Sequence, residues 1–207
     1  MLRMSVLAAP LGPLTQYLHL FDYWQPQTLT GTALGIEDIG IAFAIGGITA
    51  AMYSMVMYPR ERRERGGVLP IIASAYVLGT ALLYGGFFIL GLSSVTVTFL
   101  TLGLFAAIPL VAKPWLVRGA LLTGCMFGGF LFLFEAAFFA AYPGIVDAWW
   151  FGAAWGRVWG VPYEEIVWGV LWGVAGASGT ELALRIRTRI PGMYSSAVAQ
   201  DREPPHS

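Results

Sequence analysis

The sequence predicts an all-α protein that lies in a membrane as a bundle of about five transmembrane helices. Of its 207 residues, 57% are hydrophobic and 12% are charged, whereas about a quarter of the residues in a soluble domain are charged. The mean hydropathy of +0.67 agrees with this bias. Several apolar segments also approach the roughly 20 residues that a helix needs to cross a bilayer.

Breaks in the apolar pattern divide the chain into spans. The first span ends at Pro59 and a charged run, the third ends at Lys113, and the last begins at Pro162, a residue that suits the first turn of a helix. The resulting spans cover about 37–58, 69–92, 95–112, 119–142 and 162–185, within one integral membrane domain over 1–190.

The two ends of the chain lie outside this pattern. Residues 1–20 are apolar, but Pro10, Gly12 and Pro13 interrupt them. We therefore expect a short interfacial or re-entrant helix there rather than a full span. Residues 191–207 are polar and predict a disordered tail.

The basic residues predict an orientation. With the N-terminus outside, ten of the twelve Lys and Arg residues lie on the cytoplasmic side, and only Arg3 and Arg157 lie outside. An excess of Lys and Arg marks cytoplasmic loops. We therefore expect a multi-pass protein of the cell membrane, surrounded by the lipid bilayer, with its C-terminal tail in the cytoplasm.

Residue counts exclude several kinds of site. A single cysteine, Cys125, cannot form an internal disulfide or a cysteine-based metal cluster, and the two histidines stand near opposite ends of the chain. We therefore expect no metal and no cofactor. The only lysine, Lys113, lies in a predicted loop, which argues against a retinal Schiff base. The net charge of zero gives no sign of nucleic-acid binding.

A short acidic and aromatic pattern occurs twice. Residues 22–24 read Asp-Tyr-Trp and lead to Gly-Ile-Glu-Asp at 35–38, just before the first span. Residues 147–150 read Asp-Ala-Trp-Trp and lead to Pro-Tyr-Glu-Glu at 162–165, just before the fifth. These two spans run in the same direction. We therefore interpret 21–58 and 146–185 as a parallel internal repeat with its acids at the outer face.

The acidic pairs Glu37-Asp38 and Glu164-Glu165 have two interpretations. Acidic residues in the first turn complement the helix dipole, so helix capping explains either pair alone. The duplication favours a functional site, and so does Glu135 inside the fourth span, because an ionisable residue within a membrane is costly. A carboxyl group in apolar surroundings beside a like charge is easier to keep neutral. One acid could then donate a proton while its neighbour accepts one.

Four tryptophans accompany these acids. Trp24 and Trp150 belong to the two motif loops, where anchoring at the membrane interface is the alternative role. Trp168 and Trp172 are four residues apart and share one face of the fifth span, with Trp168 four residues after Glu164. Their rings could stabilise a carbocation by cation–π attraction, or they could pack in the core or against lipid.

On these residues the sequence resembles the membrane-integral lycopene cyclase domain family, the non-flavin type that occurs as heterodimers or fused repeats. The likeness rests on Pro162 to Glu165 followed by Trp168, and on the counterpart at 35–38, which has no proline. It covers most of 21–58 and about 119–185. The family's units usually have three spans each, and the first unit here lacks an evident opening helix.

The resemblance implies an intramolecular lyase or isomerase of carotenoid biosynthesis that causes no net redox change. A carboxylic acid would protonate the terminal double bond of a linear carotenoid, the cation would close a six-membered ring, and a base would remove a proton. We assign Glu164 and Glu37 as the principal acids, with Glu165 and Asp38 either as partner bases or as groups that adjust the pKa of the acids. The candidate residues for binding the polyene, which would enter from lipid, are Glu135, Trp168, Trp172, Trp24 and Trp150.

A non-enzymatic membrane subunit is the competing interpretation. In such a transporter component, the carboxylates would bind a hydrophobic or cationic small molecule. A scaffold in which every acid is a helix cap is the third. The sequence leaves open whether the chain works alone, with a second copy or with a different subunit.

Overall fold

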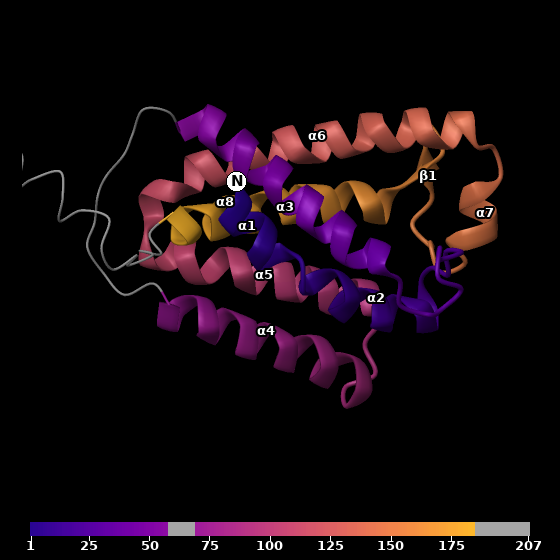
Figure 1. The fold of residues 1–207 in the computed structure, drawn as a ribbon, viewed down its shortest axis with the longest axis horizontal. Helices are drawn as coiled ribbons and strands as arrows, with labels where there is room; N and C mark the ends of the chain where they lie inside the picture. The colour runs from indigo at the N-terminus through magenta and orange to yellow at the C-terminus, as the bar shows by residue number, and fades with distance from the viewer. Residues whose placement is uncertain (58–68, 185–207) are drawn as a thin grey trace, which may run out of the picture.

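The computed structural model describes residues 1–57 and 69–184, and this part of the chain is mostly helical (Figure 1). Five of its helices are long and apolar enough to cross a membrane, which confirms the predicted all-α membrane bundle. The predicted tail at 191–207 lies outside the described residues. The five helices are α3 (Ile36–Met57), α4 (Leu69–Phe88), α5 (Ser94–Ala112), α6 (Val117–Ala141) and α8 (Tyr163–Leu184).

The second span is shorter than the predicted 69–92. Helix α4 ends at Phe88, and the chain then turns through Gly91, whose φ is +66°. Glycine reaches this left-handed region without a steric penalty. After the turn, Ser93 caps α5, because its hydroxyl accepts a hydrogen bond from the backbone N–H of Thr96 at 3.3 Å.

The beginning of the chain forms two short helices, α1 (Leu2–Ala8) and α2 (Leu11–Asp22), in place of the expected interfacial or re-entrant helix. Pro10 lies at the break between them, since it has no N–H with which to continue a helix. Both helices follow α3 and run antiparallel to it (Figure 1). Gly46 of α3 is close to α1, whereas Gly12 of α2 is close to Asp38 near the start of α3.

The two short helices together reach from one end of the bundle to the other. At one end, Arg3 Nη1 donates to the carbonyl of Ala183, near the C-terminal end of α8, at 3.4 Å. At the other end, the N–H of Ser94 donates to Asp22 Oδ2 at 2.9 Å. The N-terminus therefore lies at the same end as the last turn of α8, whereas the sequence predicts opposite sides. Pro10 interrupts the helical hydrogen bonding between α1 and α2, but the chain continues toward the other end of the bundle.

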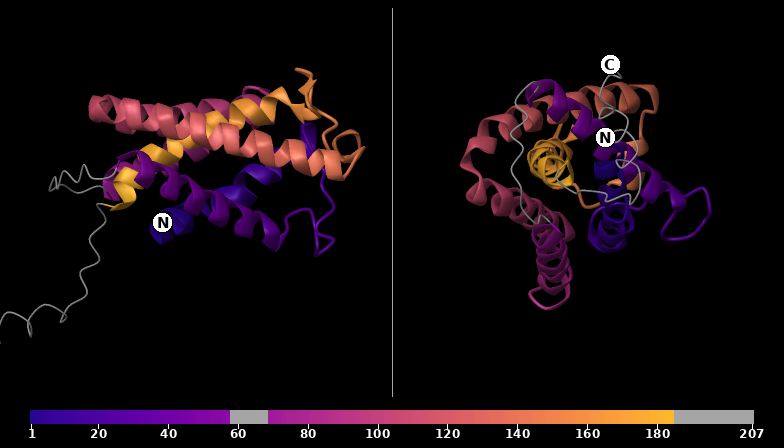
Figure 2. Two further views of the ribbon diagram at one scale, coloured as in Figure 1. Left: turned by 90° about the horizontal axis from the view of Figure 1, so that it is seen from above. Right: turned by 60° about the vertical axis from the view of Figure 1, so that its left-hand side comes forward.

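Helix α8 is the centre of the bundle. In the right-hand, oblique view of Figure 2, α8 lies among α3, α5 and α6. In addition, 61% of the α8 span is buried, whereas none of the other four spans exceeds 33%. Its closest partner is α6, because Gly124 and Gly128 of α6 face Gly173 and Val170 of α8. Small residues at such positions let the backbones of membrane helices approach each other.

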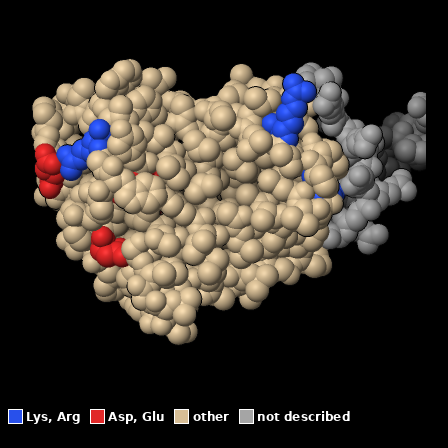
Figure 3. All heavy atoms as spheres, turned by 180° about the vertical axis from the view of Figure 1, so that it is seen from behind, with Lys and Arg blue, Asp and Glu red and all other residues tan. Residues whose placement is uncertain are grey.

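Charged side chains gather at the two ends of the molecule (Figure 3). At one end, Arg157 forms an ion pair with Asp147 at 2.6 Å. We call this the acidic end, because α3 and α8 both begin there with their acidic pairs. The opposite end carries Arg3 and Lys113, and we call it the basic end. Such a charge-poor middle suits the interior of a bilayer.

The chain between α6 and α8 is more ordered than the loop that its sequence predicts. Helix α7 (Ile145–Trp149) is followed by a small hairpin, in which β1 (Arg157–Val158) pairs with the antiparallel β2 (Val161–Pro162). Trp159 and Gly160 form its turn with φ values of 51° and 85°. Two positive φ values are characteristic of a type I′ turn. The hairpin delivers the chain into α8 immediately after Pro162.

The contact between α6 and α8 gives a first testable prediction. A Cβ added at Gly173 would lie 2.7 Å from the Cα of Gly124 and 2.9 Å from the carbonyl oxygen of Thr123. We expect Gly173→Ala to destabilise the protein by about 1–3 kcal/mol, because overpacking moves backbone apart. The apparent unfolding free energy in detergent measures this.

The matched control is Gly129→Ala on α6, where an added Cβ meets nothing within 4 Å. It should leave the unfolding free energy unchanged or slightly raised, because alanine is the better helix former. Equal loss of stability in both variants would contradict the proposed contact.

Candidate functional site

A cavity of about 620 Å³ lies toward the acidic end of the bundle. This volume is within the range of about 300–1,000 Å³ that is usual for small-molecule sites. Helices α2, α3, α4, α5, α6 and α8 contribute to its mostly apolar wall, together with the loops that precede α3 and α8. All nine residues predicted for the site line this one cavity. They are Glu37, Asp38, Glu135, Glu164, Glu165, Trp24, Trp150, Trp168 and Trp172.

The two motif loops are bonded to each other over the end of the cavity. The N–H of Gln25 donates to the carbonyl of Trp149, and the N–H of Gly152 donates to the carbonyl of Tyr23, both at 2.9 Å. The rings of Trp24 and Trp150 meet at a centroid distance of 4.9 Å. A Cβ at Gly152 would overlap the backbone carbonyl of Asp22, so only glycine allows this approach.

Glu164 is fixed by its own loop. Its Oε1 accepts hydrogen bonds from the backbone N–H groups of Ala154 and Trp155, each at 2.8 Å, and the residue is 3% exposed. Its Oε2 is buried and has no hydrogen-bond partner in the protein. One oxygen therefore anchors the carboxyl group, and the other is available to a ligand or a proton.

Glu37 has the same arrangement at the start of α3. Its Oε1 accepts from the backbone N–H of Leu29 at 2.9 Å, and its buried Oε2 has no hydrogen-bond partner in the protein. In both motifs, then, the first acid of the pair bonds the loop that precedes its helix. This local likeness agrees with the predicted parallel repeat, which remains a prediction for the chain as a whole.

Glu165 connects the second motif to the first. Its Oε1 accepts from the hydroxyl of Tyr23 at 2.9 Å and from the indole N–H of Trp150 at 2.8 Å. Burial, followed by the charge of Glu165 and its hydrogen bond, raises the pKa of Tyr23 above its ordinary value. The phenol consequently stays protonated and donates. The sequence places Tyr23 in a motif loop but gives no sign that it contacts the other motif.

Glu135 completes a group of three acids. It comes from α6, its Oε2 is buried without a hydrogen-bond partner in the protein, and its charge interacts with that of Glu165. Tyr23 lies close enough to Glu135, Glu164 and Glu165 for their charges to contribute to its raised pKa. No Lys or Arg is among the described residues that line the cavity. Among the described residues, the acids are therefore together in the cavity without a Lys or Arg.

Asp38 takes the role of a helix cap. Its Oδ2 accepts from the N–H of Gly35 at 2.9 Å, which is the bond that an acid three residues after the cap position makes. The capping interpretation thus holds for Asp38, although its side chain also lines the cavity. The two halves of the site differ here, because Glu165 reaches across to the other loop instead.

The tryptophans of α8 serve both packing and lining. Trp168 and Trp172 are stacked with ring centroids 5.5 Å apart and an interplanar angle of 17°. Trp172 is buried and donates from Nε1 to Thr49 Oγ1 of α3 at 3.0 Å, so it also holds α3 and α8 together. Trp168 is only partly buried and also lines the cavity.

A second wall of the cavity is polar but uncharged, and we did not predict it. It joins α2 to α5, where His19 Nδ1 is 2.8 Å from Ser94 Oγ and His19 Nε2 is 3.4 Å from Thr98 Oγ1. Gln16 and Thr101 lie on the same helices and also line the cavity. The only early sign was an isolated histidine in an apolar segment.

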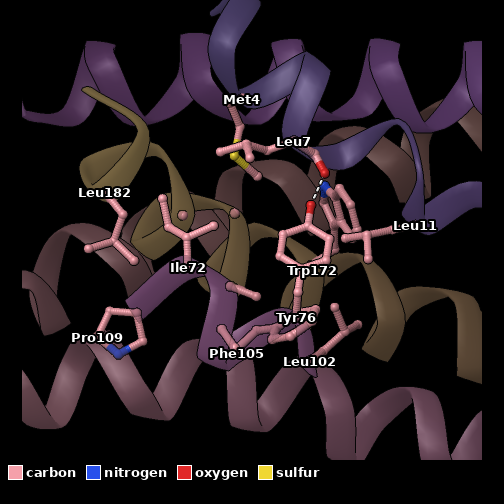
Figure 4. Close-up of a pocket in the computed structure, with 14 residues that line it drawn as sticks. Met4, Leu7, Leu11, Ile72, Tyr76, Leu102, Phe105, Pro109, Trp172 and Leu182 are labelled. Atoms are coloured by element: carbon pink, nitrogen blue, oxygen red, sulfur yellow. Dashed lines mark hydrogen bonds between the residues drawn. The ribbon is translucent and has the colours of Figure 1, made fainter. Parts of the chain in front are cut away.

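A smaller apolar pocket of about 70 Å³ adjoins the cavity toward the basic end (Figure 4). Trp172 and Leu102 line both spaces. In the small pocket, the hydroxyl of Tyr76 from α4 donates to the carbonyl of Leu7, next to the break between α1 and α2. This bond supports the backbone where the helical pattern is interrupted.

No cluster of three or more His, Cys, Asp or Glu side chains with the arrangement of a metal site occurs within residues 1–57 and 69–184. A comparison of the chain with models of protein families, with curated proteins and with solved structures found no match.

The bond between Tyr23 and Glu165 gives a second prediction. Tyr23→Phe and Glu165→Gln each alter this contact, so a double-mutant cycle should return a coupling energy of about 1–3 kcal/mol, the usual value for a hydrogen bond to a charged group. The measurement is the unfolding free energy of the wild type, both single variants and the double variant in detergent.

The matched control is Tyr142→Phe combined with Glu165→Gln, because Tyr142 is exposed and does not line the cavity. The coupling energy from that cycle should be zero within experimental error. A coupling energy of zero in the Tyr23 cycle as well would show that the two side chains do not interact.

Proposed function

We propose that the cavity is the active site of a membrane enzyme that cyclises the end group of a linear carotenoid by acid catalysis, without redox change. The observation that carries the proposal is the meeting of five carboxyl groups in an aromatic cavity within a membrane bundle, with no Lys or Arg among the described residues that line it. Acids in water-poor surroundings can be kept neutral and then act as proton donors. The likeness of the motifs to the lycopene cyclase family supports the same chemistry.

The reaction needs an acid and a base and consumes no other reagent. In the proposed sequence, a neutral carboxyl group gives its proton to the terminal carbon–carbon double bond. The resulting carbocation is attacked by a nearby double bond, which closes the six-membered ring. A carboxylate then removes a proton from the ring carbon next to the cation, leaving a ring double bond. The product is an isomer of the substrate, so atoms and electrons balance.

Glu164 is the proposed acid. Its Oε1 is already occupied by two backbone N–H groups, which leaves Oε2 to carry the proton. Glu165 is the proposed base, held by Tyr23 and Trp150 at a fixed place beside Glu164. A fixed catalytic group needs no reorganisation at the moment of reaction. Glu135 then adjusts the charge of the pair from the facing helix.

The aromatic wall supports a cationic intermediate. The stacked pair Trp168 and Trp172 and the contacting pair Trp24 and Trp150 all line the cavity. The face of an indole ring attracts a cation by roughly 0.5–2 kcal/mol or more when water is excluded. The stabilisation acts on the carbocation and not on the neutral polyene, which is what catalysis requires.

The first motif has a smaller part in this proposal. Glu37 keeps an oxygen without a protein partner and remains a second candidate acid, whereas Asp38 is engaged as a helix cap. We therefore reduce the role of Asp38 from base to positioning of Glu37.

The orientation is also part of the proposal. We place the basic end in the cytoplasm, because Arg3 and Lys113 lie there and Arg157 at the other end is neutralised by Asp147. Both the N-terminus and the end of α8 are then cytoplasmic, and the acidic end faces outward.

A ligand-binding subunit without catalysis is the second candidate. The described lining of the cavity gathers acidic groups and holds no Lys or Arg, which would also suit a cationic small molecule. This alternative predicts binding of an organic cation with no new carotenoid product.

The test is expression of the full chain in a bacterium that accumulates lycopene. We expect cyclic carotenoid with the wild type and its loss by at least a hundredfold with Glu164→Gln, because removing a general acid typically costs about 10²–10⁴ in rate. The readout is pigment separated by chromatography and identified by absorption and mass, at equal protein in the membrane.

Asp147→Asn is the matched control, since Asp147 is an exposed acid that lies outside the cavity lining. It should retain wild-type product levels. Unchanged product with Glu164→Gln would overturn the assignment of the acid, and no cyclic product from the wild type would favour the ligand-binding subunit.

A further inference from the structure

The second wall of the cavity belongs to a series of polar contacts between the antiparallel helices α2 and α5, which we call the polar ladder. Its outermost member, Asp22, is an acid and lies outside the cavity lining. Helix α2 runs toward the acidic end and α5 runs away from it. The outermost contact is the bond from the N–H of Ser94 to Asp22 Oδ2 at 2.9 Å. One turn further in, His19 contacts Ser94 Oγ at 2.8 Å and Thr98 Oγ1 at 3.4 Å. Side chains one turn apart on a helix lie on the same face, so the ladder should continue inward.

At the next position inward along this ladder, two polar atoms have no hydrogen-bond partner among the described residues. Gln16 lies one turn before His19, and Thr101 lies one turn after Thr98. Gln16 is 4% exposed and Thr101 is 6% exposed, and both line the cavity. Even so, Gln16 Nε2 and Thr101 Oγ1 are buried atoms with no hydrogen-bond partner in the protein.

Unpaired polar atoms at such a place are costly. A buried polar group without a partner costs about as much as a lost hydrogen bond, so native proteins nearly always satisfy such groups. Two of them, on different helices but at one level of one cavity, indicate a partner that comes from outside the chain. An amide N–H needs an acceptor, and a hydroxyl can donate or accept.

We propose that Gln16 and Thr101 form a binding site for a neutral oxygen function, a hydroxyl or carbonyl, carried by the polyene that occupies the cavity. The ligand would then be an oxygenated polyene rather than a pure hydrocarbon. The acids of α6 and α8 would face its reacting end, and the open level of the ladder would hold its oxygen. The inference rests on the proposed function only for the polyene class of ligand.

The charge of the cavity agrees with a neutral oxygen. A carboxylate or phosphate on the ligand would meet the acids of the cavity without a Lys or Arg in its described lining. A hydroxyl or carbonyl avoids that repulsion and still satisfies both unpaired atoms. A ligand that lacked the oxygen would leave them unpaired, and this loss is the usual source of discrimination between such ligands.

The experiment compares two probes, lycopene and a lycopene with one terminal hydroxyl, on the full chain in lipid nanodiscs. Binding is read from quenching of tryptophan fluorescence, since Trp24, Trp150, Trp168 and Trp172 line the cavity. We expect the hydroxylated probe to bind about three- to tenfold more tightly, the worth of one net hydrogen bond.

Variants assign this preference to the site. Gln16→Leu combined with Thr101→Val should abolish the preference without lowering the affinity for lycopene, because it removes the two polar atoms that lycopene leaves unpaired. Thr101→Ser alone should keep the preference because it keeps the hydroxyl. The matched control is Thr180→Val, since Thr180 is buried on α8, bonds its own helix and does not line the cavity.

Equal binding of the two probes by the wild type, or a preference that persists in the double variant, would overturn the inference. If the double variant no longer binds lycopene, the two single variants are judged by the same criterion. The preference is measured without turnover. A preference without ring formation would refute only the proposed catalysis, and ring formation without a preference would refute only this site.

Discussion

The site depends on the contact between the two motif loops. Two backbone hydrogen bonds join residues 23 and 25 of the first loop to residues 152 and 149 of the second. The contact needs Gly152, because any Cβ there would overlap the carbonyl of Asp22. It closes the bundle at the acidic end and brings Tyr23 within hydrogen-bonding distance of Glu165. Without it, the acids of α3 and α8 would lie on parallel helices but would not share one cavity.

The acidic residues at the starts of α3 and α8 differ in role. Some cap their own helix, and others are free of that role and available for the proposed chemistry. Asp38 is engaged by the first turn of its own helix, whereas Glu164 bonds loop N–H groups and Glu165 bonds the opposite loop. Acidic residues at helix N-termini cost little folding free energy, because the helix dipole favours them. A fold can therefore gather several acids at one end of a bundle at small cost. What makes them a candidate site is the largely apolar, aromatic space that they share, with no Lys or Arg in its described lining.

Much of the fold could be predicted, because the requirements of a membrane leave clear patterns in the sequence. The five long helices match the predicted spans, since uninterrupted backbone hydrogen bonding is required in lipid and Pro, Gly and charged residues mark its ends. The gathering of Glu37 and Glu164 also followed from the sequence, since parallel spans put their first turns at one end. The course of residues 1–22 did not, because Pro10 suggested that the chain turns back at a point where it only breaks a helix. The contact of Tyr23 with Glu165, and the ladder of Gln16, His19 and Thr101, join segments far apart in sequence and leave no local pattern.

The contact between the loops can be measured directly by cross-linking. Gln25→Cys and Ala148→Cys place two exposed thiols beside the paired backbones in a Cys125→Ser background. A short bifunctional maleimide should link them within the monomer, and mass spectrometry should recover the joined peptides. A pair at Gln25 and Val111, from the acidic end and from near the C-terminal end of α5, should remain unlinked. If both thiols of the first pair react with a monofunctional maleimide but never join, the loops are apart, and the shared cavity on which the function rests does not exist.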